Sequence, residues 1–276
     1  MNIGCHVSMS KGLTHAAKDV FDIGGNTFQF FSRNPRGGSP PKFGIDDIEN
    51  FNKFVNNNNF GFMVAHAPYV LNLCSAKEEV RKFSLKMLEE DLVFFNEIPR
   101  ILYNFHPGTH GGQGVRNGVK FISDALNCVL NKNIKITVLL ETMAGKGNEI
   151  GANFMEIKQI IQNVDNNEKL GVCLDTCHIY DAGYDIVNNL NGVLEDFDKN
   201  IGLNRLKVLH LNDSKNKLMS KKDRHEKLGQ GTLGIEPFRK IINHPVLENL
   251  IFILETPNDL LGYKNEILFL QGLLCD

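Results

Sequence analysis

The sequence predicts an α/β protein with one domain over residues 1–276, folded as a (β/α)8 TIM barrel with a metal site at the C-terminal face of its strands. Eight short apolar segments have the length of buried strands, and a helix-like segment follows each of them. No linker or low-complexity tract interrupts this alternation. An open doubly wound sheet is the competing architecture. The absence of a G-x-G-x-x-G motif at a first helix counts against a dinucleotide-binding version of it.

Each element has a local signal, taken in chain order. Strands are expected at residues 2–8, 27–31, 62–66, 101–106, 135–141, 170–175, 205–210 and 250–255. Helices are expected at residues 12–25, 45–56, 75–96, 114–130, 154–162, 192–201, from 235, and at 263–274. Glycines close the first helix, and Ser75-Ala-Lys-Glu78 is typical of a capping box that opens the third. Pro and Gly mark residues 32–42 as an irregular loop, and a long polar loop is expected between His210 and Gly234.

Composition restricts the class of protein. The formal net charge is −2, from 32 acidic and 30 basic residues, so no global basic signature indicates nucleic-acid binding. The six cysteines form no C-x-x-C pair, which suits reduced, mostly buried thiols of a cytoplasmic protein. The N-terminus does not resemble a signal peptide, and no apolar run approaches the ~20 residues of a membrane span. We therefore expect a soluble, intracellular protein.

Six consecutive predicted strands end in a side chain that can bind a metal ion. These residues are His66, His106, Glu141, Asp175, His210 and Glu255. Polar residues commonly follow apolar strands, so each alone means little. Because strand ends of a barrel converge on one mouth, however, the six together indicate a metal site.

Three further candidates are expected in loops on the same face: His178, just after the sixth strand, and Asp223 and His225 in the long polar loop. If the backbone there is extended, Asp223 and His225 point the same way and could hold one ion. Nine ligands suit three divalent ions, at three or four ligands each. Mixed nitrogen and oxygen ligation favours Zn²⁺, with Mn²⁺ or Fe²⁺ as possible substitutes. Clustered ions of this kind suit phosphate-ester hydrolysis.

Two basic loops and an apolar pair lie near the expected mouth. The basic residues are Arg33, Arg36 and Lys42 after the second strand, and Lys215, Lys217, Lys221, Lys222, Arg224 and Lys227 after the seventh. Beside a metal centre they indicate contacts with a phosphate backbone. Tyr69 and Val70 offer a flat ring and an apolar wedge for a distorted duplex.

Taken together, these segments resemble endonuclease IV, the zinc-dependent apurinic/apyrimidinic (AP) endonuclease family 2. The resemblance runs from Asn2 to about Glu266. It rests on His66-Ala-Pro-Tyr69, Asn104-Phe-His106-Pro-Gly108, Leu140-Glu141-Thr142-Met-Ala144-Gly145, Cys173-Leu-Asp175-Thr176-Cys-His178, His210-Leu-Asn212-Asp213, Asp223-Arg224-His225 and Leu254-Glu255-Thr256.

The resemblance implies three zinc ions per chain and assigns the ligands. His66, His106 and Glu141 would hold the first ion. Glu141, Asp175, His210 and Glu255 would hold the second, with Glu141 shared, and His178, Asp223 and His225 the third. The implied reaction is hydrolysis of the phosphodiester 5′ to an abasic site by a metal-bridging hydroxide, which leaves a 3′-hydroxyl and a 5′-deoxyribose phosphate. Glu141 and Glu255 would be its catalytic residues, and trimming of 3′-blocked ends is also implied.

The same resemblance implies a DNA partner. The substrate would be double-stranded DNA with an abasic site, and Arg36, Tyr69 and Val70 match the positions with which the family penetrates it. From the basic loop we add Arg224 as a DNA contact, and we expect a monomer. Val70 replaces the Leu common in the family, and the segment after Arg36 lacks a large side chain. Two other functions stay open: a metal-dependent sugar isomerase or epimerase with the same barrel, which needs no third ligand set, and a non-catalytic protein that binds damaged DNA.

Overall fold

The computed structural model describes residues 1–35, 38–39, 43–130 and 133–274. Eight parallel strands in these ranges form a closed barrel in the order β1-β10-β7-β6-β5-β4-β3-β2. The strands are β1 (Asn2–His6), β2 (Thr27–Phe31), β3 (Met63–His66), β4 (Ile101–Phe105), β5 (Thr137–Glu141), β6 (Leu170–Asp175), β7 (Leu206–His210) and β10 (Ile251–Leu254). The predicted fold class is confirmed.

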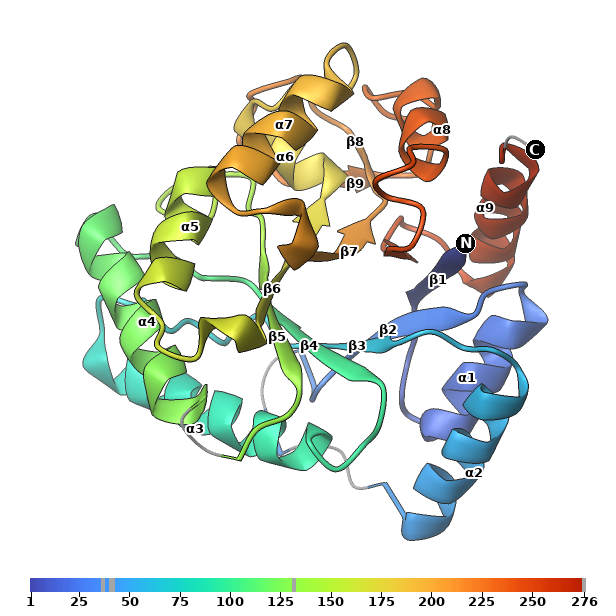
Figure 1. The fold of residues 1–276 in the computed structure, drawn as a ribbon, viewed down its shortest axis with the longest axis horizontal. Helices are drawn as coiled ribbons and strands as arrows, with labels where there is room; N and C mark the ends of the chain where they lie inside the picture. The colour runs from blue at the N-terminus through green and yellow to red at the C-terminus, as the bar shows by residue number, and fades with distance from the viewer. Residues whose placement is uncertain (36–37, 40–42, 131–132, 275–276) are drawn as a thin grey trace.

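Helices surround the strands, and α9, the last helix, lies beside β1, the first strand (Figure 1). The helices are α1 (Leu13–Asp22), α2 (Ile45–Asn57), α3 (Glu78–Phe95), α4 (Val115–Leu130), α5 (Phe154–Gln162), α6 (Thr176–Ala182), α7 (Leu190–Asn200), α8 (Glu236–Ile242) and α9 (Leu260–Gly272). Two short 3-10 helices, η1 (Asn167–Lys169) and η2 (Leu203–Arg205), precede β6 and β7. No helix within the described ranges is both long and apolar enough to cross a membrane.

The barrel interior explains why polar strand ends meet. A cluster of buried apolar side chains, separate from the larger core, comes from alternate strand positions: Val64, Leu102, Leu139, Cys173, Val208, Ile251 and Ile253. Side chains two residues apart on a strand share one face. Glu141, Asp175 and His210 each follow a member of this cluster by two residues and are fully buried. They therefore form the next layer inside the barrel, at the carboxyl ends of the strands.

Two local predictions about helices were wrong. Helix α3 begins at Glu78 after Lys77, and the Ser75 hydroxyl accepts the Lys77 N–H, so the expected capping box does not form. His178 lies in α6 rather than in a loop. Asp175 caps this helix by accepting the His178 N–H at 2.8 Å, and Gly183 ends it in the left-handed conformation. The sequence did contain a signal for this helix: an Asp that can cap the N–H three residues later, and a glycine where the helix ends.

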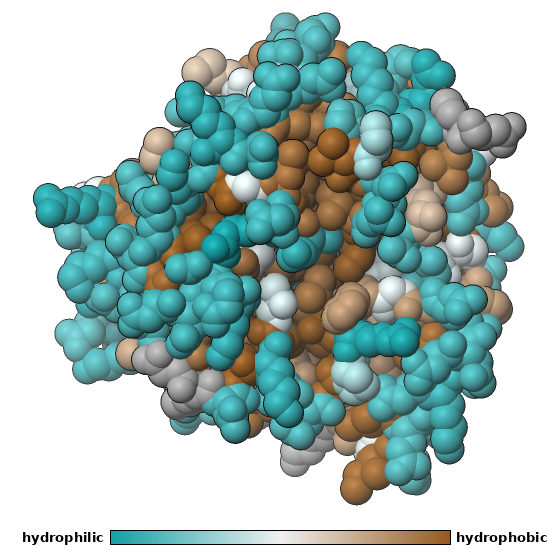
Figure 2. Space-filling view, viewed as in Figure 1, coloured by the Kyte–Doolittle hydropathy of each residue, from teal (hydrophilic) through white to brown (hydrophobic). Residues whose placement is uncertain are grey.

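The long polar segment after β7 also differs from the expected loop. It contains an antiparallel pair, β8 (Asp213–Ser214) and β9 (His225–Glu226). Asp223 has φ 55°, so the backbone is not extended at this position. In the space-filling view, polar side chains cover most of the rim, and apolar atoms are visible in the hollow toward the middle (Figure 2).

Candidate metal centre

The nine predicted ligands converge in the barrel mouth as three sets. The ligand atoms within each set lie within 4.8 Å of one another. The sets are His66, His106 and Glu141; Glu141, Asp175, His210 and Glu255; and His178, Asp223 and His225. Glu141 belongs to two of them, which is the sharing expected from the sequence. The structure thus brings the predicted residues together, and their role as ligands stays a prediction.

Four imidazoles have one ring nitrogen at an oxygen acceptor and the other turned into the cluster. The Nδ1 atoms of His66 and His178 lie 2.7 and 2.8 Å from the Ala67 and Thr142 carbonyl oxygens. For the other two, Nε2 of His210 lies 2.8 Å from Gln29 Oε1, and Nδ1 of His225 lies 3.4 Å from Glu255 O. A carbonyl oxygen only accepts, so each of these nitrogens carries the proton. The opposite nitrogen points toward the other candidate ligands, an arrangement typical of metal-ligating histidines.

Buried amides hold the three carboxylates of the mouth. Asn104 Nδ2 donates to Glu141 Oε2 at 2.5 Å, and Asn212 Nδ2 donates to Asp175 Oδ2 at 2.7 Å. Gln29 Nε2 donates to Glu255 Oε1 at 2.5 Å.

Together with His6, whose Nδ1 lies 3.5 Å from Glu255 Oε1, these amides are the residues that sequence reasoning missed. Their positions in the sequence could have identified them. Each lies within two residues of the carboxyl end of a predicted strand.

The donor set fits divalent ions. Six buried side-chain atoms among the described residues lack a well-formed hydrogen bond, and three of them are Glu141 Oε1, His210 Nδ1 and His225 Nε2. Uncompensated buried polar atoms are costly and uncommon. Half of them fall in this cluster: Glu141 Oε1 and His210 Nδ1 lie 3.4 Å apart, and His225 Nε2 lies 3.6 Å from Asp223 Oδ1. A bound cation would satisfy these atoms, so the residues suit the zinc ions that the family resemblance implies.

Opposite charges stabilise one another in this layer. Burial alone raises the pKa of Glu141, but His106 and His210 lower it well below its ordinary value. Burial lowers the pKa of His178, whereas Asp175 and Asp223 raise it well above the ordinary value. The carboxylates are therefore ionised, as ligands must be.

Two thiols reach the cluster without joining the proposed sets. Cys173 approaches Glu141 and His210, and Cys177 approaches Asp175. Burial raises the pKa of Cys173 to about 12, and it raises the pKa of Cys177 as well. The neutral thiol form is therefore favoured at both positions in the absence of a metal ion.

Of the predicted DNA contacts, three lie on the surface around the mouth. Tyr69 and Val70 are 66% and 40% exposed. The Tyr69 ring lies 6.3 and 6.1 Å from the rings of His66 and His106. Arg224 is exposed, and its guanidinium donates to the Asp223 carbonyl oxygen at 2.7 Å. Arg36, and Lys42 in the same loop, lie outside the described residues.

The prediction for Arg33 was wrong. Its guanidinium is buried and pairs with Asp91 at 2.5 Å and with Glu90 at 3.4 Å. Asp91 also accepts hydrogen bonds from Ser32 and Tyr103. The charge of Arg33 is therefore neutralised inside the protein and is not available to a phosphate. It anchors the start of the loop onto α3.

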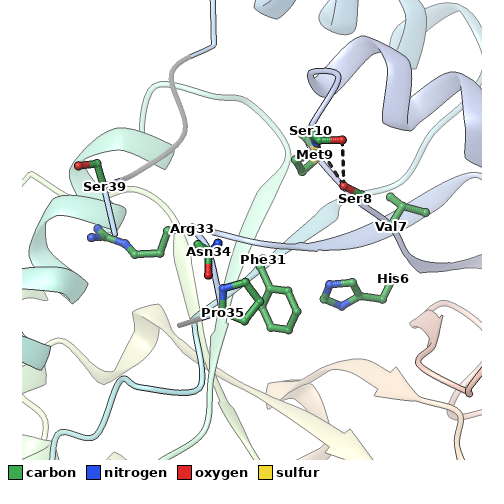
Figure 3. Close-up of a pocket in the computed structure, with 10 residues that line it drawn as sticks. All are labelled: His6, Val7, Ser8, Met9, Ser10, Phe31, Arg33, Asn34, Pro35 and Ser39. Carbon is green, nitrogen blue, oxygen red and sulfur yellow. Dashed lines mark hydrogen bonds between the residues drawn. The ribbon is translucent and has the colours of Figure 1, made fainter. Parts of the chain in front are cut away.

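A cavity of about 540 Å³ adjoins the mouth between the segments after β1 and β2. Figure 3 shows His6 and Phe31 on one side of it, and Ser8 and Ser10 joined by hydrogen bonds on the other. The rings of His6 and Phe31 are 4.4 Å apart. His6 lines this cavity and also lies 3.5 Å from Glu255 Oε1, so the cavity is next to the second ligand set.

Comparison with known proteins places the chain in a family. The family described as xylose isomerase-like TIM barrel matches residues 17–273. The chain is 55% identical over 273 residues to a probable endonuclease 4 of Clostridium beijerinckii, with 99% of each chain covered. It is 53% identical over 272 residues to a probable endonuclease 4 of Clostridium botulinum, covering 99% of this chain and 98% of that one.

Comparison with solved structures gives the same family. Endonuclease IV from Thermus thermophilus superposes with a TM-score of 0.86 at 31% identity, covering 99% of this chain and 98% of the other. A D-psicose 3-epimerase from Clostridium cellulolyticum H10 covers all of both chains with a TM-score of 0.70, but at 14% identity it shows the shared fold alone. This chain belongs to the endonuclease IV family of the xylose isomerase-like TIM barrels.

Proposed function

We propose that this protein is a metal-dependent DNA-repair endonuclease that hydrolyses the phosphodiester 5′ to an abasic site in double-stranded DNA. The products would be a 3′-hydroxyl and a 5′-deoxyribose phosphate, and trimming of blocked 3′ ends is part of the proposal. The observation that carries it is the convergence of nine nitrogen and oxygen ligands into three sets that share Glu141. Relatives that match this chain over nearly their full length are named probable endonuclease 4.

The proposal places one divalent ion in each set, with zinc favoured by the mixed nitrogen and oxygen donors. When bound, such ions polarise a phosphodiester, activate water and neutralise a leaving oxygen. Manganese or iron could replace zinc at the same donors.

The residues of the chain fix the geometry around the reacting phosphate. Glu141 is fully buried, and Asn104 holds one of its oxygens while the other stays free for shared ligation. Among the three carboxylates at the ends of barrel strands, Glu255 is the accessible one, with a side chain 17% exposed against 0% for Glu141 and Asp175. We therefore assign to Glu255 the contact with the reacting phosphate and its attacking water.

The ionisation of Glu255 supports this role. Burial raises its pKa, but the adjacent His210 imidazole lowers it well below the ordinary value. Gln29 and His6 hold Oε1, so Oε2 is the oxygen that faces His210 Nδ1, at 3.0 Å. The carboxylate is thus both ionised and oriented, which preorganises the site.

The surface of the mouth suits a DNA backbone. Lys217, Lys221, Lys222 and Arg224 are exposed on the segment between β8 and β9. Lysine and arginine side chains of this kind contact phosphates without reading sequence. Tyr69 and Val70 follow β3 at the mouth. Inserting them where a base is missing costs less free energy than separating two stacked bases. A monomer acting inside the cell remains our expectation.

A cleavage assay tests the proposed function. The substrate is a labelled duplex with one tetrahydrofuran abasic analogue, and the control is the same duplex without the lesion. Zinc-loaded protein should nick the first duplex at the 5′ side of the lesion and leave the second intact, and a chelator should abolish cleavage. An intact lesion-containing duplex at high enzyme concentration would contradict the proposal.

The same experiment separates the two other functions. A non-catalytic binding protein would retard the lesion-containing duplex without cutting it. A sugar epimerase would need only the first two sets, so the third set, with His178, Asp223 and His225 in mutual reach, favours the nuclease. Removing that third set should leave an epimerase unaffected and should impair a nuclease.

A further inference from the structure

Asp223 is the ligand candidate with the weakest support from regular structure. The other eight lie on a strand or helix, or directly after a strand. Asp223 instead sits between β8 and β9 with φ 55°, a conformation that L residues seldom adopt without help from their surroundings. Its Oδ1 atom nevertheless lies 3.2 Å from His178 Nε2 and 3.6 Å from His225 Nε2. Something else must hold this backbone in place.

Asp181 makes the contacts that hold it. This aspartate is fully buried at the end of α6, one turn after His178. Its Oδ2 atom accepts the Asp223 N–H at 2.9 Å and a longer bond from Asn216 Nδ2 at 3.4 Å. Its Oδ1 atom accepts the Ser214 hydroxyl at 2.7 Å. One carboxylate thus joins the helix of His178 to both ends of the segment that carries Asp223.

The backbone of the same segment follows the end of α6. Met219 and Lys221 also have positive φ, 66° and 56°. The Met219 N–H donates to the Tyr180 carbonyl at 3.1 Å, and the Lys221 N–H donates to the Asp181 carbonyl at 3.0 Å. Met219, Lys221 and Asp223, at every second position, therefore have left-handed backbones. Each of them donates its N–H to the last turn of α6. Such strain persists only where surrounding contacts fix it.

We infer that Asp181 is a positioning residue for the third ligand set: it fixes the left-handed backbone of Asp223 so that this carboxylate faces His178 and His225. This inference rests on the proposed function, because it assumes that the third set binds an ion. Asp181 touches no predicted ligand atom and acts only through the backbone of Asp223. Neighbours of this kind commonly change metal affinity by about 10- to 100-fold.

The decisive variant is Asp181→Ala. Zinc titration of the metal-free protein should show the third ion weakened by at least about tenfold, with the first two unchanged. Hydrogen exchange of the metal-free protein should show faster exchange at the amides of Met219, Lys221 and Asp223. Because the exchange measurement needs no metal and no DNA, it tests the contact even if the proposed function fails. A wild-type protein that binds fewer than three ions would count against the function itself.

Asp181→Asn separates positioning from charge. The carboxamide oxygen can still accept the Asp223 N–H while its NH2 group faces the Ser214 oxygen, so this variant should bind the third ion close to the wild-type affinity. It also supplies a folded comparison if the alanine variant is unstable. Asp47→Ala is the matched control, since Asp47 accepts the N–H groups of Leu13 and Thr14 at the start of α1. It should leave all three ions in place.

Three results would overturn the inference. The first is wild-type affinity for the third ion in Asp181→Ala, whatever happens to exchange. The second is equal loss of all three ions from a folded Asp181→Ala protein. The third is an Asp181→Asn variant that loses the third ion as fully as the alanine variant does, because charge rather than position would then be decisive.

Discussion

The strand-held part of the centre and its third ligand set differ in how they are built. Glu141, Asp175 and His210 project from the ends of barrel strands and are fully buried. In the third set, the side chains of Asp223 and His225 are 30% and 20% exposed and belong to the segment after β7. The barrel itself fixes the first group, whereas the second depends on contacts between that segment and α6. The third ion should therefore be the easier one to remove.

The largest effect should come from Glu141→Gln, because this side chain belongs to two sets. Losing one charged donor from both should lower single-turnover cleavage on the order of a thousand-fold, which corresponds to several kcal/mol of transition-state stabilisation. Metal analysis should show both strand-held ions weakened. The control Glu236→Gln changes an exposed glutamate on α8 and should cut normally. Cleavage within a few-fold of wild type by Glu141→Gln would refute the shared role.

The next effect distinguishes the two regions. His178→Ala should release the third ion and retain the first two, because His178 Nε2 faces Asp223 while its Nδ1 atom is tied to Thr142 O. Metal content per folded chain is the measurement. His15→Ala, which removes a half-exposed imidazole from α1, should change nothing. Loss of all ions in parallel would mean that the sets are not separable.

A smaller effect is expected from the amides around the strand-held ions. Gln29→Leu removes the donor to Glu255 and the acceptor for His210, so it should weaken the second ion by about 10- to 100-fold while the third stays bound. Competition with a zinc-binding dye measures this directly. Gln271→Leu, which removes a surface bond to Gly24 O, is the matched control. Preferential loss of the third ion would contradict the division drawn here.

The smallest effect should be confined to DNA. Tyr69→Ala should weaken binding to the abasic duplex by about 1–3 kcal/mol, the usual contribution of a stacked aromatic ring, with metal content unchanged. Tyr69→Phe keeps the ring and should bind normally. Electrophoretic mobility shifts under non-cleaving, metal-free conditions give the comparison. Equal weakening by both variants would assign the contribution to the hydroxyl group instead.

These two regions also differ in what the sequence reveals. The convergence of the strand-end candidates could be predicted because an apolar run that stops at a His, Asp or Glu marks both the strand and its end. For Asp223 and His225, the residue types indicated possible ligands. The left-handed backbone and the short β8–β9 pair could not be predicted, because they depend on contacts with α6. Arg33 was misassigned since its partner Asp91 lies 58 positions away in the chain.

The buried amides were missed for a related reason. Gln29, Asn104 and Asn212 are neutral and have no ligand chemistry of their own, so nothing in their type separates them from polar residues at the surface. Only the closed barrel shows that each donates to a carboxylate. Prediction from sequence thus reached the candidate metal ligands and stopped short of the amides that hold them in place.

The most direct test of the account is a count of bound ions by native mass spectrometry. Metal-free protein is titrated with zinc, and the mass of the folded chain is followed at each step. Three ions per chain are predicted, with the third binding last and most weakly because its ligands are the more exposed. A plateau at two ions or fewer, at zinc concentrations that support full cleavage, would contradict the account.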